Sequence, residues 1–173
     1  MGELERIEDQ LRRGLEGGAW HGPAVLELLA GVIAAQAHAR PIPGARGIWE
    51  LVLHLGGAYR LVLRRLRGDA TQLDPDEDWP PVPEPSEANW TAAVEGLRSL
   101  NADVRRAVMG FDPGHLDAPL VADPPYSAYT QFVGLTQHDL YHAGQMALLK
   151  RALAGRGTPL DVSPTTDSRG SGQ

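Results

Sequence analysis

Two histidines, His138 and His142, stand four residues apart in a segment that ends three residues later with Gln145. Positions i and i+4 of an α-helix share one face, with Cβ atoms about 5–6 Å apart. Both imidazoles can then reach a single metal ion at roughly 2.0–2.1 Å. Two ligands hold an ion poorly, so a third must come from another segment. The best candidate is His54, which lies among apolar residues in segment 49–55.

The composition restricts such a site to nitrogen and oxygen ligands. The 173 residues include no cysteine, which excludes thiolate zinc sites, disulfides and a cysteine nucleophile. A lone histidine on an apolar stripe is more often a hydrogen-bonded core residue, and two histidines at this spacing also occur by chance. Three such histidines strengthen the metal-site interpretation, but spacing alone leaves both interpretations open.

Two further polar residues of this segment are candidates for a supporting catalytic role. Gln145 is expected to hydrogen-bond a metal-bound ligand or a histidine ring, with a bond to the backbone as the alternative. Asp139 would need a histidine N–H from a neighbouring element, the alternative being a solvated or arginine-paired carboxylate. Tyr141 is expected to pack between helices with its hydroxyl at the edge. Three histidines in connecting segments are not expected to be ligands: His21, His38 and His115.

Apolar residues at spacings of three and four predict four long helices, and no segment shows convincing strand alternation, so the expected class is all-α. A single domain is expected over residues 1–155, followed by a flexible tail over 156–173 that is rich in Gly, Ser, Thr and Pro. The long helices are predicted over 3–16, 47–67, 86–110 (with Ser86 as N-cap) and 127–153 (with Ser127 as N-cap), and shorter helical pieces over 23–29 and 34–39.

The proline-rich segment 69–85 is predicted to be a long crossover that cannot continue a helix. About 17 extended residues reach more than 50 Å, whereas a 21-residue helix is about 32 Å long. This segment can therefore return along the bundle and leave the second and third long helices parallel. The three histidines continue the inward stripes of their helices, where a polar group needs a partner, and a metal ion in the bundle would supply one.

The charge and hydropathy of the chain argue against two classes of partner. A net charge of −6 and a pI of about 5.4 disfavour nucleic acid, because phosphate binding needs a concentrated basic face. The apolar stretches fall short of the roughly 20 residues that span a bilayer, and the first residues lack the features of a signal peptide. We expect a soluble, cytoplasmic protein that binds neither nucleic acid nor membranes.

The residues also resemble a known family. Segment 138–145, with the Met-Ala-Leu-Leu-Lys-Arg sequence that follows it, resembles the C-terminal motif of the DinB-like superfamily, the DinB/YfiT group of metalloenzymes. Residues 49–55 resemble the segment that carries the first histidine of that group, and residues 20–29 resemble the opening region of one of its branches. The similarity runs from about Leu4 to Leu153, and the last helix is its most specific part.

The resemblance implies a four-helix bundle of up-down-down-up topology, with a divalent ion held by His54, His138 and His142 near one mouth of the bundle. In such proteins the ion is usually zinc or nickel. Characterised relatives include thiol-dependent transferases and isomerases that use low-molecular-weight thiols such as bacillithiol or mycothiol. Many members have no assigned reaction, and no substrate-binding motif can be matched residue by residue. A homodimer is expected by analogy and from the general frequency of two-fold dimers.

Three neutral histidines leave at least one coordination position open, as in catalytic zinc sites, and lower the pKa of bound water toward about 7. A bound thiol would favour group transfer and bound water would favour hydrolysis of a small molecule. The alternative is a non-catalytic metal-binding or stress-response bundle in which the ion stabilises the fold. A third hypothesis is a helical module that binds a partner without any metal. An open position that faces a pocket favours the enzyme, and a fourth protein ligand favours the structural role.

Overall fold

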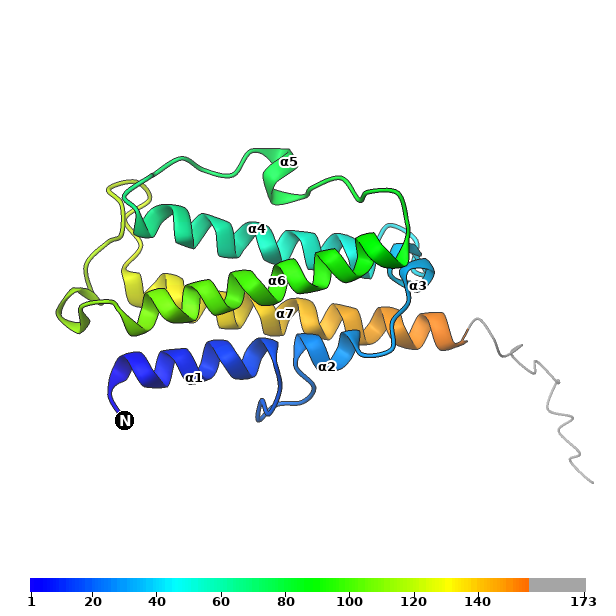
Figure 1. Cartoon of the computed structure of the whole chain (residues 1–173), viewed down its shortest axis with the longest axis horizontal. Helices are drawn as coiled ribbons and strands as arrows, with labels where there is room; N and C mark the ends of the chain where they lie inside the picture. Colours follow the sequence, from blue (N-terminus) through cyan, green and yellow to red (C-terminus); the bar gives the residue numbers. More distant parts are fainter. Residues whose placement is uncertain (156–173) are drawn as a thin grey trace, which may run out of the picture.

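The protein is all-helical in the computed structural model, which describes residues 1–155 (Figure 1). Over these residues no strand is present, and Pro119 and Ser127 form an isolated antiparallel bridge. The predicted tail, 156–173, lies outside the described residues. The helices are α1 Glu3–Leu15, α2 Val25–Leu29, α3 Ala34–His38, α4 Ile48–Leu66, α5 Pro75–Asp78, α6 Glu87–Met109, the short 3₁₀ helix η1 Pro113–His115, and α7 Ala128–Gly155.

The four long helices α1, α4, α6 and α7 lie side by side. The helix α4 packs against α6 and α7, and α1 packs against the same two helices. In Figure 1 the chain runs from left to right in α1 and α7 and from right to left in α4 and α6. The crossover between α4 and α6 carries α5, which lies against α4. The chain thus returns along the length of α4 before α6 begins.

The two predicted serine caps are present at the starts of α6 and α7. The Oγ of Ser86 accepts a hydrogen bond from the N–H of Asn89 at 3.2 Å, and the Oγ of Ser127 accepts one from the N–H of Thr130 at 3.1 Å. Each bond satisfies one N–H that has no partner within the helix. These caps fix where α6 and α7 begin.

The crossover differs from its prediction in one respect, because it contains the one-turn helix α5. Asp74 accepts hydrogen bonds from the N–H groups of Asp76 and Glu77, and Pro75 occupies the first helical position. Proline is compatible with that position because its missing N–H would have no helical partner there. A proline-rich segment can therefore hold one helical turn although it cannot continue a long helix.

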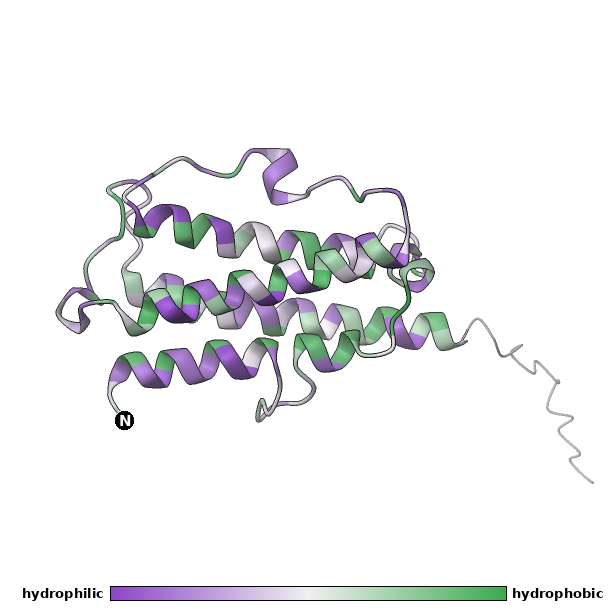
Figure 2. Cartoon of the chain, in the orientation of Figure 1, coloured by the Kyte–Doolittle hydropathy of each residue, from purple (hydrophilic) through white to green (hydrophobic). Residues whose placement is uncertain are grey.

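One apolar cluster fills the space between the long helices, and its largest fully buried side chains are Trp49, Tyr59 and Phe132. Trp90 on α6 donates from its ring N–H to the carbonyl of Val32 at 2.7 Å, which ties the α2–α3 segment to the bundle. Figure 2 shows hydrophobic and hydrophilic patches on α1, α4 and α6, as expected for helices with one face in the core.

A buried polar network crosses the core and touches all four long helices. Tyr59 on α4 donates to Oδ2 of Asp139 on α7 at 2.6 Å. Asn101 on α6 donates to Oη of Tyr59 at 2.8 Å and to the carbonyl of Leu11 on α1 at 3.1 Å. Buried polar groups are costly unless they are paired. These bonds therefore favour one alignment of the four helices beside His138.

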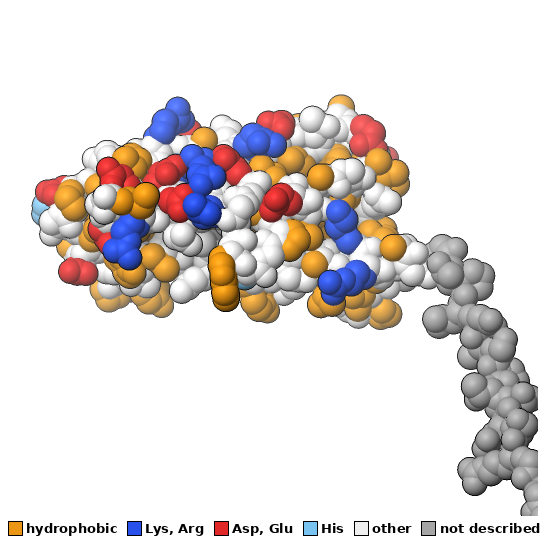
Figure 3. Space-filling model, turned by 90° about the horizontal axis from the view of Figure 1, so that it is seen from below, with side chains coloured by type: hydrophobic (Ala, Val, Ile, Leu, Met, Phe, Trp, Pro, Cys, Tyr) orange, Lys and Arg blue, Asp and Glu red, His pale blue; other side chains and the backbone are white. Residues whose placement is uncertain are grey.

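Figure 3 shows the face of the molecule on which α1 and α2 lie, and acidic and basic side chains are interspersed over it. Positive charge does not gather into a patch on that face. Within residues 1–155, no helix combines the length and apolar character that crossing a bilayer requires.

Candidate metal centre

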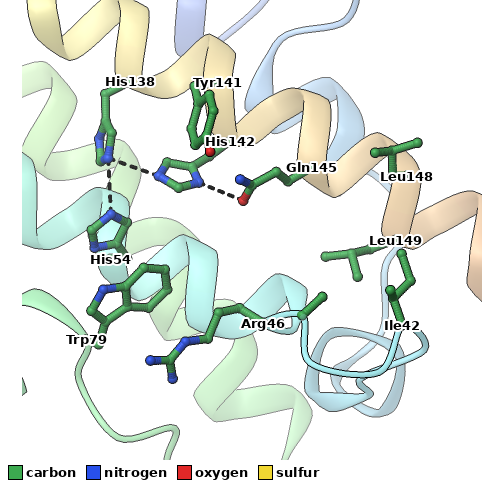
Figure 4. Close-up of a pocket in the computed structure, with 11 residues that line it drawn as sticks. Ile42, Arg46, His54, Trp79, His138, Tyr141, His142, Gln145, Leu148 and Leu149 are labelled. Atoms are coloured by element: carbon green, nitrogen blue, oxygen red, sulfur yellow. Dashed lines mark hydrogen bonds between the residues drawn. The ribbon is translucent and has the colours of Figure 1, made fainter.

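The structure brings the three predicted histidines together (Figure 4). His54 projects from α4, and His138 and His142 project from α7 toward it. The Nε2 atom of His138 lies 3.1 Å from Nε2 of His54 and 3.0 Å from Nε2 of His142. The candidate ligand atoms of all three residues lie within 4.8 Å of one another. Three nitrogen donors, separated by up to 88 residues in sequence, thus converge on one point.

The opposite nitrogens of two of these rings face hydrogen-bond acceptors. Nδ1 of His54 lies 2.8 Å from the carbonyl oxygen of Asp78 and 3.1 Å from its carboxylate. Nδ1 of His142 lies 3.0 Å from Oε1 of Gln145. Because an acceptor faces each Nδ1, we assign an N–H to Nδ1 of both rings. The Nε2 atoms of His54 and His142 then carry lone pairs that point at His138.

This proton assignment makes the cluster a good fit for a cation. His138 has one ring N–H and can donate it to only one of the two lone pairs that face its Nε2. At least one of these two lone pairs is therefore left without a full hydrogen bond until a cation lies between the three nitrogens. Nitrogen ligands at 2.0–2.1 Å from a tetrahedral ion are about 3.3 Å apart. The observed separations of 3.0 and 3.1 Å require little adjustment to reach that value.

The surroundings of His138 and His142 favour the neutral form of each ring, which is the form that binds metal. Burial, with the nearby His142 and His54 acting in the same direction, lowers the pKa of His138 from 6.5 to about 4. Burial also lowers the pKa of His142, with His54 acting in the same direction, although the bond to Gln145 raises it. At pH 7 the neutral His138 loses no net proton on binding an ion through Nε2, but its one ring proton must then lie on Nδ1.

The crossover supplies two residues of the site that sequence reasoning missed, Asp78 and Trp79. The indole ring of Trp79 stacks on the ring of His54, with centroids 3.9 Å apart and an angle of 3° between the planes. Asp78 faces Nδ1 of the same ring. Together they restrain the plane and the proton of His54, as residues around a metal ligand commonly do. The sequence contained one signal for them. Asp74 followed by Pro75 is a typical helix start, and one helical turn from there ends at Asp78 and Trp79.

Close approach of the crossover to α4 depends on a glycine. A Cβ atom at Gly57 would lie 2.7 Å from the carbonyl oxygen of Glu77, which is too close for two non-bonded heavy atoms. The carboxylate of Glu77 also pairs with Arg64 at 2.5 Å. The glycine and this ion pair hold α5 against α4, one turn from His54.

A cavity of about 600 Å³ opens beside the three histidines. Its walls are mainly apolar, and no carboxylate from the described residues lines it. Within residues 1–155 the group of potential metal ligands consists of the three histidines, without a fourth His, Cys, Asp or Glu. A coordination position can thus face the cavity. The lining residues are Ile42, Ala45, Arg46, His54, Trp79, His138, Tyr141, His142, Gln145, Leu148 and Leu149.

Comparison with known proteins identifies the family. A family model described as the DinB superfamily matches residues 19–146, a range that includes all three histidines and Gln145. The chain belongs to the DinB superfamily. The resemblance seen in segments 49–55 and 138–145 is therefore confirmed. No curated protein matches this chain.

Among solved structures, this DinB-superfamily chain is similar to the conserved protein of locus from Enterococcus faecalis. The two share 18% sequence identity with a TM-score of 0.57, over 88% of this chain and 93% of that one. At this identity the match supports the fold and carries no information on activity.

The other residues predicted for the site lie in three different settings. Gln145 lines the cavity and accepts a hydrogen bond from His142. Asp139 is fully buried and bonds Tyr59 rather than a histidine ring. Tyr141 is 66% exposed at the rim of the cavity, so the interhelical packing predicted for it is wrong. Its position faces away from the core because it lies about 100° around α7 from His142. The exposed residues His21, His38 and His115 lie outside the cluster.

Proposed function

We propose that this member of the DinB superfamily is a divalent-metal-dependent enzyme that acts on a small molecule. His54, His138 and His142 would hold the ion through their Nε2 atoms. The observation that supports this most directly is the convergence of three Nε2 atoms at the wall of a cavity of about 600 Å³, where the described residues add no fourth His, Cys, Asp or Glu. Catalytic metal sites have this combination of three protein ligands and an accessible position.

The residues around the histidines have separate tasks in this proposal. Asp78 and Gln145 keep protons on Nδ1 of His54 and His142, which leaves the Nε2 lone pairs free for the ion. Trp79 restrains the ring of His54 by stacking. When bound, a divalent ion lowers the pKa of a coordinated thiol or water, so that a nucleophile is available at neutral pH.

The remaining residues hold the small molecule or support the ligands. The apolar walls of the cavity would contact apolar parts of a bound molecule, and the amide N–H groups of Gln145 are available to it because the amide oxygen is used by His142. Asp139 would act as a positioning residue, since its bond to Tyr59 fixes α7 next to His138. The reaction class is transfer if a thiol is activated and hydrolysis if water is activated.

Several finer features belong to the same proposal. Zinc is the first candidate for the ion and nickel the second, since imidazole ligands suit both. A low-molecular-weight thiol is the proposed co-substrate, by resemblance to the family. We also propose the up-down-down-up order of a four-helix bundle, one domain over residues 1–155, a cytoplasmic location and a homodimer, the commonest form of soluble oligomer.

The test begins with His142→Ala in untagged protein, analysed for metal content and helicity. Wild type is expected to retain about one metal ion per chain and the variant to lose it while remaining helical, because the core buries far more than one ring. The matched control is His115→Ala, which removes an exposed histidine of η1. Equal metal content in His142→Ala and wild type would contradict the proposed site.

Activity is then screened on the metal-loaded protein with electrophiles and several low-molecular-weight thiols, and with hydrolysable esters and amides. Turnover that is lost in His142→Ala and retained in His115→Ala supports the enzyme. Metal that raises the melting temperature without any turnover would instead favour the non-catalytic metal-binding bundle.

A further inference from the structure

A second cavity lies on the other side of Trp79 and Arg46 from the histidines. Its volume is about 470 Å³, and the cavity beside the metal centre shares these two residues with it as walls. The second cavity is polar where the first is apolar, because it is also lined by Arg40 and the buried carboxylate of Glu50. The two cavities are thus neighbours, with the three histidines lining the first and the guanidinium groups of Arg40 and Arg46 lining the second.

The charges in the second cavity do not balance. Glu50 accepts hydrogen bonds from Nε and Nη2 of Arg40, from Nη1 of Arg46 and from the backbone N–H of Gly47, all at 2.8 Å. Burial alone raises the pKa of Glu50, but these donors lower it below its ordinary value, so the carboxylate is ionised at neutral pH. Two guanidinium groups therefore face one carboxylate, which leaves a surplus of one positive charge.

Arg40 satisfies Glu50 with a two-pronged contact, whereas Arg46 gives it a single N–H. The side chain of Arg46 is 51% exposed, and its remaining N–H groups are accessible to a ligand. The structural role of capping Glu50 requires only Arg40 and Gly47. The second guanidinium is therefore available for another anion.

Arg46 is held close to the metal centre by stacking. Its Cζ atom lies 4.5 Å from the centroid of the Trp79 ring, and the His54 ring lies 3.9 Å from the same centroid. Figure 4 shows Trp79 between His54 and Arg46. The centroid of the His54 ring and Cζ of Arg46 are therefore at most about 8.4 Å apart. A small molecule that reaches from the ligand position past the edge of Trp79 would meet a guanidinium whose orientation is already fixed.

We propose that Arg46, supported by Arg40, forms an anion subsite next to the metal centre, and that the molecule bound there carries a carboxylate several bonds away from its metal-binding atom. This inference rests on the proposed function, because it assumes that the same molecule occupies the coordination position. A carboxylate is favoured because its single charge matches the surplus charge of the cluster and its two oxygens match the guanidinium fork. The ligand has an apolar middle part, to match the walls formed by residues such as Ile42 and Leu149.

The test compares two thiols of equal chain length, 6-mercaptohexanoate and 6-mercaptohexanol, by calorimetric titration of zinc-loaded protein. In wild type we expect the carboxylate to bind about tenfold more tightly than the alcohol, as for a charge-assisted hydrogen bond. In Arg46→Gln the preference is expected to fall below about twofold, while the protein still binds zinc. The matched control is Arg106→Gln, which removes an exposed arginine of α6 that pairs with Asp103.

Equal affinity of the two thiols in wild type, with zinc bound, would overturn the subsite and leave the proposed metal centre intact. A preference that survives in Arg46→Gln would also overturn it. If Arg46→Gln is unfolded, as judged by its melting temperature, Arg46→Lys replaces it. Lysine keeps the charge but loses the planar fork and the stacking, so the preference is expected to fall at least about threefold. Failure of both thiols to bind, together with loss of zinc, would overturn the proposed function and the subsite with it.

Discussion

The position of one proton decides whether each histidine of this site can be a metal ligand. An imidazole binds through the nitrogen that lacks a proton, and here an oxygen acceptor draws the proton of two rings to Nδ1. The acceptor for His54 is the backbone and side chain of Asp78, and the acceptor for His142 is the side chain of Gln145. The second of these is open to a direct test because it is a single replaceable amide.

Gln145→Ala is expected to weaken metal binding by about 10–100-fold, because the His142 ring loses the acceptor that fixes its proton and its orientation. The measurement is competition with a chromophoric chelator. Gln137→Ala, which changes an exposed amide of the same helix, serves as the control and is expected to leave the affinity unchanged. Equal affinities in both variants would show that Gln145 does not orient the ring.

At the scale of elements, the crossover between α4 and α6 does more than connect two helices, because its residues contact the proposed metal ligand His54. It reaches His54 because Gly57 lets the carbonyl of Glu77 approach α4, and because Arg64 pairs with Glu77. Trp79 and Asp78 follow directly and contact the ring. A change that lifts the crossover from α4 should therefore disturb the metal centre without altering any ligand.

Gly57→Ala is expected to destabilise the protein by about 1–3 kcal/mol, because the new methyl group overlaps the Glu77 carbonyl. Metal affinity should fall with it. Gly96→Ala is the matched control, since a Cβ there meets nothing within 4 Å and the position is exposed on α6. The control should be stabilised by up to about 1 kcal/mol through helix propensity. Urea unfolding measures the free energy of unfolding of both variants. An unchanged value for Gly57→Ala would contradict the close contact between Gly57 and the Glu77 carbonyl.

The polar network between the four long helices contains a buried carboxyl group, that of Asp139, from which the pH dependence of stability can be predicted. Burial raises the pKa of Asp139 from 3.8 to about 7, although the bond from Tyr59 lowers it. The folded protein therefore binds more protons than the unfolded chain between these two pH values. The stability that Asp139 contributes is present at low pH and is lost as the pH rises toward 7.

Asp139→Asn removes this titration while keeping an oxygen that can accept from Tyr59. Relative to wild type, the metal-free variant is expected to gain at least about 1 kcal/mol in unfolding free energy between pH 5 and pH 8. Urea unfolding at the two pH values gives this difference. Asp103→Asn alters an exposed carboxylate, and its difference from wild type should stay constant. A constant difference for Asp139→Asn as well would mean that Asp139 is ionised throughout.

At the scale of the whole molecule, features that depend on local spacing could be predicted from the sequence. The long helices, the caps at Ser86 and Ser127 and the shared face of His138 and His142 follow from periodicity within one segment. The inward direction of His54 followed from its apolar stripe. Its stacking on Trp79 could not be predicted, because that contact depends on the path of the crossover. The partner of Asp139 was missed for the same reason, since Tyr59 precedes it by 80 residues.

The four long helices hold the fold together, whereas the crossover between α4 and α6 contacts the proposed metal ligand His54. The four long helices are aligned by their apolar core and by the Tyr59 network, neither of which involves α5. Substitutions at Asp78 can therefore alter the electron-donating strength of the His54 imidazole and leave the packing of the four long helices intact. Natural or designed variation at this position of the crossover is thus a route to new metal preferences in an unchanged bundle of helices.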